Sequence, residues 1–234
     1  MRISSTWIGA GAVALVGLAA LGWAGCSGGG SRSGTTEPPV PDTFRVRFET
    51  SAGSFTVLVH RAWAPRGAVR FYRLVRAGYF DGNRFFRVIP GFVAQFGVAG
   101  DTARALQWRR RPIRDDPVRK SNTRGTLTFA SAGNDTRTSQ VFINLSDNAR
   151  LDRMGFAPFG EVVEGMGAVD SIYSGYGETA PDGKGPDPAR MFHEGNAYLE
   201  KDFPKLDSIR HARLLGEPAA TPGEASGATD ATAG

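Results

Sequence analysis

Residues 85–97 read FFRVIPGFVAQFG, and this stretch indicates how the chain folds. Pro90 and Gly91 separate two short runs, Arg84 to Ile89 and Phe92 to Phe96, that are rich in aromatic and β-branched residues. Runs of this length and composition, bounded by turn residues, are typical of β-strands. The stretch therefore predicts two short strands with a turn between them.

The same pattern extends along the chain in both directions. Phe44, Val46 and Phe48 alternate with charged residues before a turn at 51–53, and the alternation resumes at Phe55, which predicts a hairpin. Further strands are expected at 126–130, 141–145, 157–163 and 206–215, helices at 65–78 and 166–173, and a long Gly- and Pro-rich loop at 174–188. Many short strands without strand–helix alternation predict a mainly β antiparallel barrel or sandwich over residues 44–215.

The first 26 residues carry a pattern typical of export. Arg2 precedes an apolar run from Ile8 to Ala24, which is too short and too weakly apolar to predict a membrane-spanning helix. Cys26 follows Ala24-Gly25, as in the lipobox of bacterial lipoproteins, although Trp23 stands where that motif usually has an aliphatic residue. We predict an exported protein, anchored to a membrane by lipid on Cys26 in the cell envelope or periplasm. Ordinary cleavage and an uncleaved anchor are the alternatives.

Composition changes mark both ends of the globular part. Residues 27–43 are rich in Gly, Ser and Pro, which predicts a flexible tether, and residues 216–234 predict a disordered tail. The formal net charge is +5, and many cations lie between Arg104 and Lys120. No aromatic ladder or zinc pattern accompanies them, so we predict a solvated loop there and expect no nucleic-acid partner.

The residue patterns of several common enzyme classes do not occur in this sequence. Cys26 is the only cysteine, which excludes an internal disulfide and a cysteine-built metal site. His60, His193 and His211 lie far apart without the spacing of metal ligands, and there is no GxSxG motif. We therefore expect no metal, and we disfavour hydrolysis and phosphoryl transfer.

Two further stretches accompany residues 85–97. Residues 125–144 read GTLTFASAGNDTRTSQVFIN, and residues 151–166 read LDRMGFAPFGEVVEGM. In this order the three stretches resemble the signatures of the cyclophilin family of peptidyl-prolyl isomerases, and the resemblance runs from about Phe44 to Leu215. It implies a closed eight-stranded antiparallel barrel capped by two α-helices. It also implies a monomer that needs no cofactor and acts on Pro-containing polypeptides.

The resemblance also assigns roles to individual positions. Arg87 matches the catalytic arginine of the family, and Gln95 matches the residue that orients it and bonds the substrate backbone. The positions that match substrate contacts, or lie beside them, are Phe92, Val93, Ala130, Gln140, Phe142, Leu151 and Phe156. Phe156 stands in place of a histidine, and Arg150 stands in place of a tryptophan found in familiar eukaryotic members.

These residue types suit the chemistry independently of the resemblance. An X-Pro amide resists rotation because resonance gives its C–N bond partial double-bond character, with a barrier of roughly 18–20 kcal/mol. The prolyl nitrogen gains a lone pair as the bond twists, so a fixed donor stabilises the twisted form more than the planar one. Arg87 can supply such a donor, since a guanidinium stays protonated and rigid.

Three functions fit the sequence. The first is an active prolyl isomerase that assists the folding of exported proteins, in which proline isomerisation can limit the rate. The second is a catalytically weak module that binds Pro-containing or unfolded segments. The third is an envelope adaptor that uses its tether and basic run to hold a partner. The first is favoured by Arg87 together with Phe92, Gln95 and Phe142, because binding alone does not require a donor directed at the prolyl nitrogen. The absence of the family's tryptophan and histidine favours the second.

Overall fold

A computed structural model describes residues 39–216 of the chain. The predicted export signal, the lipidation site Cys26, most of the tether and nearly all of the tail lie outside these residues. Within them, no helix is both long and apolar enough to cross a membrane.

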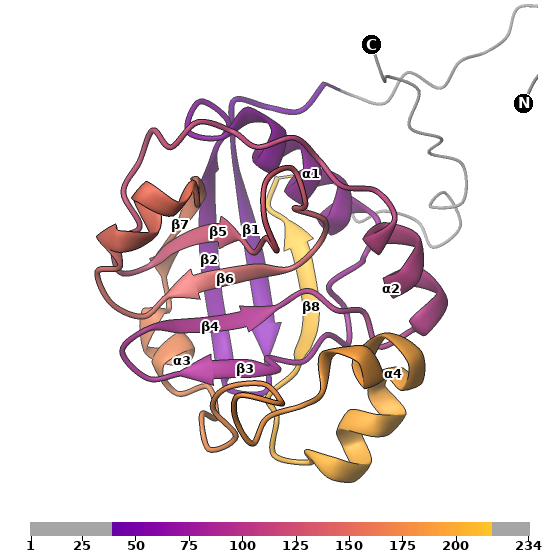
Figure 1. The fold of residues 1–234 in the computed structure, drawn as a ribbon. Helices are drawn as coiled ribbons and strands as arrows, with labels where there is room; N and C mark the ends of the chain where they lie inside the picture. Colours follow the sequence, from indigo (N-terminus) through magenta and orange to yellow (C-terminus); the bar gives the residue numbers. More distant parts are fainter. Residues whose placement is uncertain (1–38, 217–234) are drawn as a thin grey trace, which may run out of the picture. The chain divides into compact units, whose positions relative to one another are not determined.

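One antiparallel sheet of eight strands forms the framework, in the order β3-β4-β6-β5-β7-β2-β1-β8. The strands are β1 (Thr43–Thr50), β2 (Gly53–His60), β3 (Arg87–Ile89), β4 (Val93–Phe96), β5 (Thr126–Phe129), β6 (Val141–Asn144), β7 (Pro158–Glu164) and β8 (Ile209–Leu214). Figure 1 shows β4, β5 and β6 crossing in front of β1 and β2, so the sheet curls back over itself. The mainly β, antiparallel, eight-stranded prediction is confirmed.

The predicted closure of the barrel is not confirmed. β3 and β8 end the pairing order and form no ladder with each other. The segments before them meet instead, through an isolated bridge between Arg84 and Ser208 and a hydrogen bond from the Phe85 amide to the Asp207 carbonyl, 3.0 Å long. β3 has only three residues, all paired with β4, which leaves this irregular contact between the ends of the sheet.

Aromatic rings fill the space inside the curled sheet. Alternate residues of β1 are buried, as the alternation predicts, and the Phe48 ring stacks on Phe55 with 4.8 Å between centroids. Phe48 also meets Phe96 of β4 edge to face at 5.7 Å. The hairpin and the β3–β4 region therefore share one core, which fixes the inner and outer faces of β4.

Helices α1 (Pro65–Arg76) and α3 (Met166–Asp170) lie where helices are expected, but the prediction of two helices is wrong. The described residues also contain α2 (Thr102–Arg109), α4 (Pro188–Asp202) and the 3₁₀ helix η1 (Ala149–Met154). α2 buries only Ala105, so it lacks an apolar stripe. In α4, Gly195 breaks the helical backbone with φ of 61° and interrupts the periodicity.

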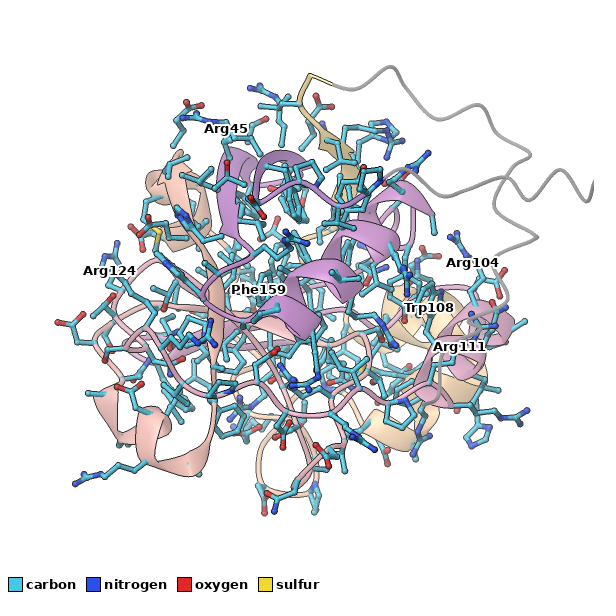
Figure 2. The ribbon with its side chains drawn as sticks, turned by 90° about the horizontal axis from the view of Figure 1, so that it is seen from above. Arg45, Arg104, Trp108, Arg111, Arg124 and Phe159 are labelled. Carbon is cyan, nitrogen blue, oxygen red and sulfur yellow. The ribbon has the colours of Figure 1, made fainter. Side chains whose placement is uncertain are left out.

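The basic run from Arg104 to Lys120 is partly helical and partly buried, which corrects the prediction of a solvated loop. Figure 2 shows Arg104, Trp108 and Arg111 together at one edge of the domain. The Arg111 guanidinium carbon lies 5.5 Å from the centre of the Trp108 ring. Asp116, further along the run, is almost completely buried and belongs to the framework.

Candidate active site

The functional candidates lie on the face of the sheet that is turned away from the aromatic core. In the register of β3, β4 and β6, Arg87 lies opposite Gln95, and Gln95 lies opposite Phe142. Their neighbours Val88, Ala94 and Ile143 belong to the core. Because side chains alternate between the two faces of a strand, Arg87, Gln95 and Phe142 form one row across the outer face.

Hydrogen bonds join the polar members of this row. Arg87 Nη1 donates to Gln95 Oε1 at 3.1 Å, and Gln95 Nε2 donates to Gln140 Oε1 at 2.9 Å. The Ala130 amide donates to the Gln140 carbonyl at 3.0 Å, which connects the end of β5 to the same group. The structure thus brings the predicted Arg87, Gln95, Ala130 and Gln140 together.

An apolar cluster, separate from the main core, lies beside the polar row. Val93, Phe142 and Leu151 are buried in it, and Phe92, Ala130 and Phe156 pack against them while partly exposed. The rings of Phe142 and Phe156 meet edge to face with 5.9 Å between centroids. All six residues are predicted substrate contacts. We call this group the apolar cluster.

Glu178 also contacts Arg87, and the sequence analysis did not identify it. Its carboxylate accepts two hydrogen bonds, from Arg87 Nε to Oε1 at 2.5 Å and from Arg87 Nη2 to Oε2 at 2.7 Å. The side chains of Arg87 and Glu178 are 21% and 33% exposed, so both are reachable from solvent. The hydrogen bonds from Arg87, aided by the Thr179 amide and the guanidinium charge, lower the pKa of Glu178 despite partial burial.

A family model described as cyclophilin type peptidyl-prolyl cis-trans isomerase/CLD matches residues 45–191, more than half of the chain. This chain belongs to the cyclophilin family. It is a peptidyl-prolyl cis-trans isomerase, as its relatives are named.

Relatives of this cyclophilin include two bacterial proteins. Peptidyl-prolyl cis-trans isomerase A of Dickeya dadantii is 38% identical over 138 residues, covering 54% of this chain and 70% of the relative. The peptidyl-prolyl cis-trans isomerase of Acinetobacter baylyi is 36% identical over 133 residues, again covering 54% of this chain and 70% of the relative. A solved cyclophilin type isomerase of Cryptosporidium parvum has a TM-score of 0.56 at 20% identity, covering 75% of this chain and 99% of its own, which shows the shared fold.

Three buried asparagines form hydrogen bonds with the backbone segments that carry the apolar cluster of this cyclophilin. Asn148 Nδ2 donates to the Phe92 carbonyl at 2.9 Å and to Asn144 Oδ1 at 2.8 Å. The Asn122 carbonyl accepts a hydrogen bond from the Asn148 amide at 2.7 Å, and Asn122 Nδ2 donates to the Phe156 carbonyl at 2.8 Å. The asparagines therefore tie the backbones on two sides of the apolar cluster together. Single buried polar residues carry no distinctive local pattern, which is why the sequence analysis missed them.

Asp152 completes this support. Its Oδ1 accepts from the Asn122 amide at 2.9 Å and from Asn122 Nδ2 at 2.8 Å, while its Oδ2 accepts from Ser121 Oγ at 2.6 Å. Burial acts to raise the pKa of Asp152, but these hydrogen bonds together outweigh it, and the pKa lies below its ordinary value of 3.8. The carboxylate holds η1, and with it Leu151, against the segment before β5.

The Phe92 ring lies near two cations at the edge of the cluster. The guanidinium carbons of Arg87 and Arg150 are 5.5 Å and 4.7 Å from its centroid. Arg150 is exposed, and it stands where familiar eukaryotic members of the family carry a tryptophan. Guanidinium groups at these distances attract the face of an aromatic ring. Arg150 therefore lies at the rim of the apolar cluster, against the Phe92 ring. Within the part of the chain that is described, no His, Cys, Asp and Glu cluster could hold a metal.

Proposed function

We propose that Arg87 is the catalytic residue of this cyclophilin and that the apolar cluster holds the proline ring of the substrate. The observation that carries the proposal is the position of the guanidinium. Gln95 bonds it on the outer face of the sheet, in the row that leads to Phe142 at the heart of the cluster. A donor and an apolar surface thus lie side by side, as rotation about an X-Pro bond requires.

The roles follow from the chemistry of rotation. A proline ring buried against Phe142, Leu151 and their neighbours fixes one side of the X-Pro bond, so rotation occurs on the other side. An Arg87 N–H then bonds the substrate near the prolyl nitrogen, where electron density gathers as amide resonance is lost. Gln95 orients Arg87, and Gln140 and the backbone at Ala130 contact the residue that precedes proline.

We also propose that the substrates are polypeptides folding after export, with the protein held in the cell envelope by lipid on Cys26. The support is the apolar run that ends in Ala24-Gly25-Cys26. Mass spectrometry of the mature N-terminus tests this part. A lipidated Cys26 as the first residue is the expected result, and an unmodified residue elsewhere in the chain as the first would contradict it.

A refolding experiment tests the isomerase function on protein substrates. The slow, proline-limited phase of a small unfolded protein lasts about 10–100 s at 25 °C without a catalyst. Substoichiometric amounts of the purified chain should shorten this phase. Refolding that slows in proportion to the amount added would instead favour the alternative, a weak binding module for unfolded segments.

A further inference from the structure

The 174–187 segment lies between α3 and α4 and places one carboxylate in the proposed active site. Of its residues, Glu178 makes the bidentate ion pair with Arg87 described above. We propose that Glu178 is a positioning residue for this isomerase, and this proposal rests on the catalytic role proposed for Arg87. It holds the guanidinium in its catalytic orientation from the side opposite Gln95.

The backbone around Glu178 is built to hold its side chain in one place. The Gly185 amide donates to the Glu178 carbonyl at 2.7 Å, and the Gly183 amide donates to the Thr179 carbonyl at 2.9 Å. A Cβ atom on Gly183 or Gly185 would lie 2.4 Å or 2.6 Å from the Glu178 carbonyl oxygen. Only glycine permits this approach, so both glycines close the segment on Glu178.

Contacts near both ends of the segment hold it to α4 and to Phe203, the residue that follows α4. The Tyr176 ring meets Phe203 edge to face at 5.0 Å. At the other end, the Asp187 amide donates to Tyr198 Oη at 2.9 Å. The carboxylate itself accepts a further hydrogen bond from the Thr179 amide at 2.9 Å. Glu178 therefore presents a fixed pair of oxygens to Arg87 rather than a freely rotating side chain.

The ion pair leaves Arg87 able to act on a substrate. A guanidinium has five N–H groups, and Gln95 and Glu178 engage three of them, one each on Nε, Nη1 and Nη2. One N–H on each terminal nitrogen remains, and the side chain is 21% exposed. The two contacts fix the plane of the guanidinium on two sides, which suits a donor that must meet a transition state.

The variant Glu178→Gln tests the proposal, because it keeps the size of the side chain and removes the bidentate carboxylate. We expect kcat to fall about five- to twentyfold while KM changes less than about twofold, since orientation matters most in the transition state. Asp182→Asn is the matched control. It makes the same change of charge in the same segment at an exposed side chain, and it should keep the activity of the unchanged chain.

A second measurement on the full chain does not depend on turnover. The Arg87 Nε–H proton should give a resolved, slowly exchanging NMR signal that Glu178→Gln loses and Asp182→Asn keeps. Absence of that signal in the unchanged chain, or an unchanged or raised kcat in Glu178→Gln, overturns the positioning role. So does a fall in kcat that merely follows a fall in Tm. An unchanged chain that shows the signal but no isomerase activity contradicts the proposed role of Arg87 itself.

Discussion

At the scale of single residues, the site depends on what surrounds Arg87 and Phe142. Gln95 reaches Arg87 from the neighbouring strand, while Glu178 comes from 91 positions further along the chain. The first contact is predictable, because both residues lie in one recognisable stretch and face each other across a short turn. No local pattern encodes the second, because it depends on how a Gly- and Pro-rich segment closes on itself.

Phe156 provides a test of the apolar cluster at this scale. Its ring packs on Phe142 while partly exposed, outside the main core. Replacement by alanine should remove about 1 kcal/mol of apolar contact with a bound proline ring, which corresponds to a rise in KM of about fivefold. Steady-state kinetics with an X-Pro peptide measures this. Met154→Ala, which alters a side chain 65% exposed in the same segment, is the control and should leave KM unchanged.

At the scale of elements, the helices depend on contacts that are distant in sequence. α1 has no side-chain cap of its own, and Asp116 serves instead, accepting the Arg66 and Gly67 amides at 3.0 and 2.9 Å. Asp116 also pairs with buried Arg137 at 3.1 Å. The eight strands were predictable because alternation and turn residues are local signals. α2 and the buried Asp116 were not, because their stabilising contacts lie elsewhere in the chain.

Removal of Asp116 should therefore be costly. Asp116→Ala removes the buried carboxylate partner of Arg137, leaves the partly exposed Asp115 as its remaining carboxylate at 3.0 Å, and uncaps α1. The free energy of unfolding should therefore fall by about 3 kcal/mol. Urea denaturation measures this change. For comparison, Asp101→Ala removes an exposed cap from α2 and should cost only about 1 kcal/mol. Equal losses in the two variants would show that burial of Asp116 has no special weight.

The hydrogen bonds that Asp152 accepts should make the stability of the domain depend on pH. Its folded pKa is lowered below 3.8, so its stabilising contribution is complete above about pH 5 and is lost as the pH falls through the folded pKa. The difference in unfolding free energy between the unchanged chain and Asp152→Asn should be constant from pH 7 to 5 and shrink towards pH 3. A difference that grows with acidity would contradict the lowered pKa.

At the scale of the whole described domain, one core connects the strands and α1. No ladder of hydrogen bonds joins β3 to β8, the two ends of the sheet. Phe48 of β1 nevertheless contacts Phe96 of β4 and Phe71 of α1. Shared packing of this kind makes unfolding cooperative. We therefore expect tryptophan fluorescence and far-UV circular dichroism to report the same urea midpoint. Separate midpoints would show that the ends of the sheet unfold independently.

The measurement that tests the central claim most directly is the rate of cis/trans exchange of a short X-Pro peptide, followed by NMR with the unchanged chain and with Arg87→Ala. Arg47→Ala, which removes an exposed arginine on β1, is the control. Loss of one transition-state donor should lower kcat about a hundredfold or more in Arg87→Ala and leave the control active. Exchange catalysed equally well by a folded Arg87→Ala variant would contradict the account.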